Sequence, residues 1–176
     1  SLKDAQQLAQ HAGQNGAVAV AALAPSHFKS ASIEELLQWT KSIAAACPET
    51  PFYFYDIPSL VGSSFSMSTY MEKAINQIPN FVGLKFTNAD LISYQRVVRQ
   101  YPDYDILFGI DECLLAALTL GCQGAVGSTY NFAAPLYHKL IAAFQRGDLE
   151  TARKLQYQSV QLVDLLCSCG GYMPAA

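Results

Sequence analysis

Residues 81–87 read FVGLKFT, and this stretch predicts both a buried strand and a reactive site. Apolar residues on both sides of Lys85 favour a strand at 81–86. A lysine in such surroundings costs free energy unless it is neutral, paired or able to reach water. A neutral lysine is a nucleophile, and its typical covalent chemistry is a Schiff base with a carbonyl substrate. The alternative is a lysine at a strand end whose ammonium group extends into solvent.

Four more segments have the composition of strands, and helical segments separate them along the chain. We expect strands at 17–24, 52–57, 105–110 and 124–127, and helices at 1–12, 32–47, 66–77, 89–100, 112–120, 134–146 and 149–167. A capping box at Ser32–Glu35 and the capping residue Asp148 mark two of the helix starts. Alternation of strands and helices at this spacing predicts βαβ units and a parallel sheet.

Five strands in 176 residues correspond to part of a larger α/β fold. A complete (β/α)₈ TIM barrel takes about 250 residues. We therefore expect residues 1–166 to form about the last five β/α units of such a barrel plus C-terminal helices, with a divergent tail at 167–176. An open, doubly wound sheet is the alternative, although neither GxGxxG nor a P-loop follows any strand.

The chain begins at Ser1 without an initiator Met, which indicates a fragment or missing upstream sequence. A partial barrel would have two open sheet edges. Inward side chains such as Phe54 and Leu84 would also lose the wall that faces them. We expect the 176-residue chain alone to be aggregation-prone and inactive.

Composition excludes several classes of protein. A hydrophobic content of 51% with 14% charged residues excludes a disordered chain. A net charge of -3, with no run of Lys or Arg longer than two, argues against partners such as nucleic acid or an anionic membrane. No apolar run reaches the length of a membrane span. The five cysteines and three scattered histidines show no metal-ligand spacing. An odd number of cysteines without a disulfide pattern indicates reduced thiols, as in a cytoplasmic protein.

Polar residues follow four of the predicted strands, where (β/α)₈ enzymes place their catalytic groups. They are Tyr55, Asp56, Lys85, Thr87, Asp111, Glu112 and residues 128–131, STYN. Helix capping would explain Asp111 and Asn131, but it would not explain Lys85 or Tyr55. Tyr55 is either a proton-transfer group or a core aromatic. Glu112 either binds a polyol or is a solvated acid in a first helical turn.

Two stretches together resemble the pyruvate-dependent class I aldolase family, which includes dihydrodipicolinate synthase and N-acetylneuraminate lyase. Residues 55–62, YDIPSLVG, are similar to the family's Tyr-x-Ile-Pro turn, and residues 83–87, GLKFT, are similar to its Schiff-base lysine strand. Residues 108–112, FGIDE, and 127–131, GSTYN, resemble the lyase branch of the family. Within that branch, the chain as a whole is most similar to the animal enzymes. The resemblance covers residues 1 to about 165.

The resemblance implies a role for each matching residue. Lys85 would attack the ketone carbon of N-acetylneuraminate and form an imine, and Tyr55 would help transfer the proton as the carbon–carbon bond breaks. The substrate's hydroxyl groups would be bound by Thr87, Gly109, Asp111, Glu112 and Ser128. The products would be N-acetylmannosamine and pyruvate, no metal or organic cofactor would be needed, and the protein would be a homotetramer.

Two features depart from the family pattern. The loop Gly-Ser/Thr-Thr-Gly-Glu, which holds the pyruvate carboxylate, is absent, and residues 25–29 lack a tyrosine that many members have there. One alternative is therefore a sister enzyme, dihydrodipicolinate synthase-like or a hydroxy-oxoglutarate aldolase, which would share Lys85 and Tyr55. The other is an inactive truncated product that associates with full-length subunits.

Overall fold

The structure is a computed structural model that describes residues 1–170. The chain divides into two compact units, Ser1–Leu107 and the part from Phe108 onward. Within the described residues, no helix combines the length and the apolar character that crossing a membrane requires.

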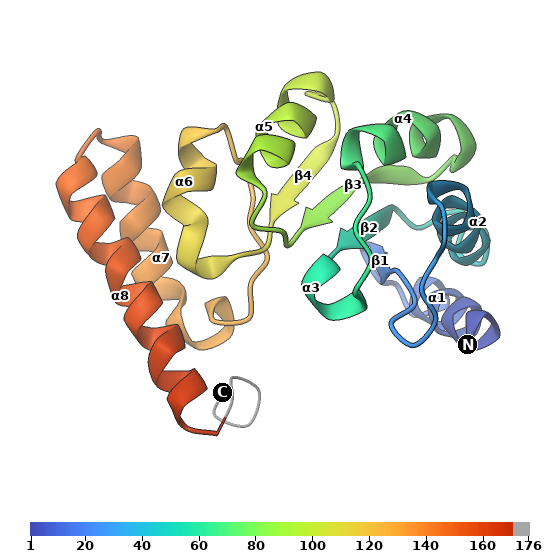
Figure 1. Cartoon of the computed structure of the whole chain (residues 1–176), viewed down its shortest axis with the longest axis horizontal. Coiled ribbons are helices and arrows are strands. Elements are labelled where there is room, and N and C mark those ends of the chain that lie inside the picture. Colours follow the sequence, from blue (N-terminus) through green and yellow to red (C-terminus); the bar gives the residue numbers. More distant parts are fainter. Residues whose placement is uncertain (171–176) are drawn as a thin grey trace. The chain divides into compact units, whose positions relative to one another are not determined.

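The first unit is a sheet whose strand order follows the sequence (Figure 1). Its strands are β1 (Val20–Leu23), β2 (Phe52–Asp56), β3 (Phe81–Phe86) and β4 (Asp105–Phe108). The pairs β1–β2 and β2–β3 are parallel. Five helices alternate with these strands: α1 (Leu2–Gln14), α2 (Ile33–Ala44), α3 (Pro58–Val61), α4 (Met67–Gln77) and α5 (Leu91–Gln100). The predicted alternation of strands and helices is confirmed.

Helix starts in this unit follow the expected capping chemistry. The Ser32 side chain accepts a hydrogen bond from the Glu35 backbone N–H at 3.2 Å, as the predicted cap of α2 requires. The Glu35 carboxylate accepts from the backbone N–H of Ala31 and not from that of Ser32, so only the Ser32 half of the predicted capping box is formed. The short helix α3 was not predicted; it starts at Pro58, whose fixed φ suits a first helical position, and ends at Gly62 with φ of 68°.

Aromatic packing joins the helices to one face of the sheet. The Phe54 ring lies 4.5 Å from the Tyr70 ring of α4, and the Phe86 ring lies 5.3 Å from the Tyr94 ring of α5. Phe54 and Leu84 are buried. The expectation that both would lose a covering wall is therefore wrong. Alternation along a strand identifies two faces, but it does not say which face the helices cover.

The second unit is mainly helical. After the 3₁₀ turn Asp111–Cys113 it contains α6 (Leu114–Thr119), α7 (Tyr130–Gln145) and α8 (Leu149–Ser168), and α7 packs along α8 (Figure 1). The predicted helix at 112–120 is thus split in two. The helix predicted from 134 starts at Tyr130, and Ala133, two positions before Pro135, has a non-helical backbone conformation.

The strand predicted at 124–127 is reduced to a single parallel bridge between Phe108 and Ala125. Only two backbone hydrogen bonds support it in the described residues: Phe108 N–H to the Gly124 carbonyl at 3.0 Å, and Val126 N–H to the Phe108 carbonyl at 2.9 Å. Two glycines in four residues weaken strand propensity here. Of the predicted tail, residues 171–176 lie outside the described part, and α8 continues through Ser168.

Candidate active site

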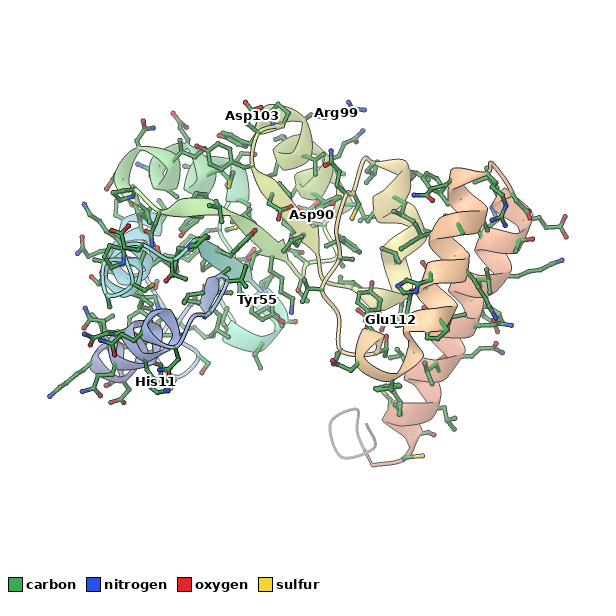
Figure 2. All side chains as sticks on the ribbon, turned by 180° about the vertical axis from the view of Figure 1, so that it is seen from behind. His11, Tyr55, Asp90, Arg99, Asp103 and Glu112 are labelled. Atoms are coloured by element: carbon green, nitrogen blue, oxygen red, sulfur yellow. The ribbon has the colours of Figure 1, made fainter. Side chains whose placement is uncertain are left out.

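Lys85 and Tyr55 are direct neighbours on adjacent strands. The β2–β3 register pairs Tyr55 with Lys85, and the Lys85 Nζ lies 3.9 Å from the centroid of the Tyr55 ring. Both side chains are half-buried, whereas Phe54, Leu84 and Phe86 beside them are buried. The alternation of β2 therefore puts Tyr55 on the face opposite to Phe54, and Figure 2 shows Tyr55 on its strand.

The contact between Lys85 and Tyr55 is a cation–π interaction, which holds the amine against the ring. Within residues 1–170, Lys85 forms no ion pair. A primary amine and a phenol side by side are the groups that an imine-forming reaction with proton transfer requires. The sequence placed both residues at strand ends, and the structure brings them together.

Thr87 lies directly after β3, two positions beyond Lys85. Its backbone N–H donates to the Asp56 carbonyl at 2.8 Å, so sheet-like pairing between the two segments continues past Phe86. Its hydroxyl oxygen is buried and has no hydrogen-bond partner among the described residues. A buried hydroxyl without a partner costs free energy. Thr87 is therefore a candidate for binding a polar ligand group.

Asp56, next to Tyr55, is a buried acid for which the sequence alone predicts no role. Its side chain is 5% exposed, and the Asn88 side-chain amide donates to its Oδ2 at 3.4 Å. Asn88 also accepts from the backbone N–H of Asp90, the capping residue of α5, at 3.0 Å. Burial raises the pKa of Asp56 from 3.8 to about 6, although the bond from Asn88 opposes this shift.

Replacing Asp56 by asparagine is expected to stabilise the protein at neutral pH and to change little in acid. Because the folded state binds this proton more tightly than the unfolded chain, the contribution of Asp56 to stability is fully present below its unfolded pKa of 3.8 and is lost as pH rises through about 6. The asparagine variant has no such loss. Its advantage should approach at most about 3 kcal/mol at pH 7.

Denaturant unfolding of both proteins at several pH values measures this difference. The matched control is Asp103→Asn, because Asp103 is an exposed acid in the loop before β4 (Figure 2). An advantage for Asp56→Asn that is equal at pH 4 and pH 7 would contradict burial as its cause.

In the second unit, the buried Asp111 carboxylate forms its hydrogen bonds with another residue of the chain. Its side chain is 5% exposed, and its Oδ2 accepts hydrogen bonds from the Thr129 backbone N–H at 2.9 Å and from the Thr129 hydroxyl. A Cβ atom added to Gly127 would meet the Asp111 carboxylate, so this approach requires glycine. The expectation that helix capping explains Asp111 is wrong, because the carboxylate fixes the Gly127–Thr129 segment instead.

The other predicted residues of this unit lie beside Asp111 in sequence or in the segment that leads into α7. Gly109 follows β4, and Glu112 lies half-buried in the 3₁₀ turn before α6 (Figure 2). Ser128 is exposed, and its carbonyl accepts a hydrogen bond from the Asn131 side chain at 3.0 Å. Asn131 therefore lies inside the first turn of α7, where its side chain stabilises the start of the helix. The N-cap of α7 is Thr129, so the expectation that Asn131 caps a helix is wrong.

One cavity of the first unit lies beside α1 and β1. It has a volume of about 520 Å³ and is lined by α1, β1, the loop after β1, which contains His27, and α2, which contains Trp39. Lys85 and Tyr55 do not line it. No cluster of metal-ligating side chains is present in residues 1–170, and all five cysteines are free.

Comparison with known proteins gives one consistent family. The Dihydrodipicolinate synthetase family matches residues 1–175. The N-acetylneuraminate lyase of Xenopus tropicalis is 40% identical over 174 residues, which make up 99% of this chain and 57% of that protein. The chain thus spans little more than half the length of this relative.

Solved structures agree. The N-acetylneuraminate lyase, or sialic acid aldolase, of Aliivibrio salmonicida superposes with a TM-score of 0.93 at 37% identity, over 98% of this chain and 57% of that one. A catalytic lysine mutant of the sialic acid aldolase of Ruminococcus gnavus superposes with a TM-score of 0.87 at 31% identity, over 96% and 54%. The predicted fold class, part of a (β/α)₈ TIM barrel, is confirmed.

Proposed function

Because the chain belongs to the dihydrodipicolinate synthetase family, we propose that it carries the catalytic lysine of a class I aldolase that cleaves N-acetylneuraminate to N-acetylmannosamine and pyruvate. The observation that carries this proposal is the pairing of Lys85 with Tyr55, with the amine 3.9 Å from the ring centroid. The names of the relatives favour this substrate over those of the sister aldolases.

The proposed reaction uses the amine and the phenol in turn. The neutral Lys85 amine adds to the ketone carbon of the open-chain sugar, and loss of water leaves a protonated imine. The imine accepts the electron pair of the breaking carbon–carbon bond as a proton leaves the neighbouring hydroxyl group. The Tyr55 phenol helps move that proton. The resulting enamine is then protonated and hydrolysed, which releases pyruvate and restores Lys85.

The remaining predicted residues are proposed to select the substrate. Thr87, with its unpartnered hydroxyl, and Gly109, Glu112 and Ser128 would contact the hydroxylated tail. Asp111 would contribute mainly by holding the Gly127–Thr129 segment in place, because its carboxylate is already bonded to Thr129.

The test is pyruvate release by a purified protein that contains this chain, with N-acetylneuraminate and hydroxy-oxoglutarate compared as substrates. Faster turnover of N-acetylneuraminate is the expected result. A preference for hydroxy-oxoglutarate would contradict the proposed substrate and favour a sister aldolase.

Replacing Glu112 by alanine is expected to weaken use of N-acetylneuraminate without weakening imine formation with pyruvate. An unpaired buried polar partner costs about 1–3 kcal/mol, which corresponds to roughly a 5- to 150-fold rise in KM. The control is Glu150→Ala, because Glu150 is an exposed acid in the first turn of α8. Equal losses for both ligands would return Glu112 to the role of a solvated acid.

A cytoplasmic homotetramer is the assembly that we propose for the protein. Five free cysteines support a reducing compartment. Sedimentation of the purified protein measures the subunit number.

A further inference from the structure

A glutamine on α8 fixes the turn that carries Glu112. Gln156 accepts a hydrogen bond at its Oε1 from the Leu115 backbone N–H at 2.7 Å. Its Nε2 donates to the Asp111 carbonyl at 3.1 Å and to the Ser159 hydroxyl oxygen at 2.8 Å. Two of these partners fix the orientation of the amide, because exchanging its oxygen and nitrogen would oppose donor to donor at Leu115 and acceptor to acceptor at the Asp111 carbonyl.

Ser159 completes the contact. It is fully buried on α8, and its hydroxyl donates to the Asp111 carbonyl at 3.3 Å. The bonded groups on the other side, the Asp111 carbonyl and the Leu115 amide, flank Glu112 and lie more than forty positions from Gln156 in the sequence. The backbone on both sides of Glu112 is therefore tied to one helix.

The Leu115 N–H is one of the first-turn donors of α6, which have no partner inside the helix. A side chain that satisfies it stabilises the start of α6 in one position. The same side chain holds the preceding carbonyl of Asp111, so the turn cannot rotate without breaking both bonds. Gln158 on the same helix is exposed, and its side chain forms no hydrogen bond within residues 1–170, so it offers a matched comparison.

We propose that Gln156, supported by Ser159, is a positioning residue for substrate specificity, because it sets the backbone from which Glu112 reaches the substrate's hydroxylated tail. The inference rests on the proposed lyase function. It predicts a loss confined to the tail-bearing substrate, while the chemistry of Lys85 with pyruvate is retained.

The experiment compares Gln156→Ala, the similarly sized Gln156→Glu, Ser159→Ala and the control Gln158→Ala in the protein that contains this chain. KM for N-acetylneuraminate is measured beside the yield of borohydride-trapped pyruvate. Both Gln156 variants should raise KM at least about fivefold, since each loses the two donated bonds. Ser159→Ala should cause a smaller rise, and Gln158→Ala should match the wild type. Trapping should be unchanged in all four.

Three results would overturn the inference. An unchanged KM in both Gln156 variants removes the positioning role. A normal KM in Gln156→Glu with a raised KM in Gln156→Ala would show that the bonds donated to Asp111 and Ser159 are dispensable, which leaves the residue only packing and the bond from Leu115. A loss of trapping in parallel with the rise in KM, in Ser159→Ala as well, shows a general structural effect. Absence of trapping in the wild type would instead refute the proposed function itself.

Discussion

Replacing Lys85 by alanine should reduce lyase activity to the uncatalysed background. Alanine has no amine, so no imine forms and the breaking bond has no electron sink. The chain offers no replacement, because all seven lysines lie in the described residues and Lys85 is the one lysine within a strand. The measurement is pyruvate release from N-acetylneuraminate, with far-UV circular dichroism to show that the variant is folded.

The matched control is Lys139→Ala, because Lys139 is an exposed lysine on α7. It should keep wild-type activity. Residual activity of Lys85→Ala well above background would show that another group forms the covalent intermediate, or that the reaction does not use one.

Replacing Tyr55 by phenylalanine should lower kcat by about 10²- to 10⁴-fold, the usual contribution of a general acid–base group. The substitution removes the hydroxyl but keeps the ring, and so it preserves the contact of the ring with the Lys85 Nζ at 3.9 Å. Imine formation should therefore survive while the carbon–carbon bond breaks slowly. Steady-state kinetics and borohydride trapping, measured on the same preparation, separate the two steps.

The control for Tyr55 is Tyr53→Phe on the same strand. Tyr53 donates to the Asp105 carboxylate at 2.9 Å, so its hydroxyl has a structural partner. Its loss should change stability more than kcat. A near wild-type kcat for Tyr55→Phe would assign Tyr55 to packing alone.

The sequence predicted the fold well where local patterns determine it. The strand at 81–86 and the caps Ser32 and Asp148 agree with the structure because apolar runs and capping chemistry act over a few residues. The face that covers Phe54 and the reduction of 124–127 to one bridge depend on packing between distant segments, which a local pattern does not record.

The same division holds for the candidate site. Lys85 and Tyr55 could be found because a polar group ending an apolar strand is visible in the sequence. The internal role of Asp111 could not be found, since its partner Thr129 lies 18 positions away. Gln156 had no local signal, because a surface-helix glutamine has the same sequence appearance whether or not it bonds to a distant backbone.

We propose Lys85 as the Schiff-base nucleophile on which the whole reaction depends. The most direct test of this assignment is mass spectrometry of the purified protein after incubation with pyruvate and borohydride, with peptide mapping of the reduced adduct. We expect one modified peptide, with the adduct on Lys85. An adduct on Lys73, Lys139 or another lysine, or no adduct under conditions where a known class I aldolase is trapped, would contradict it.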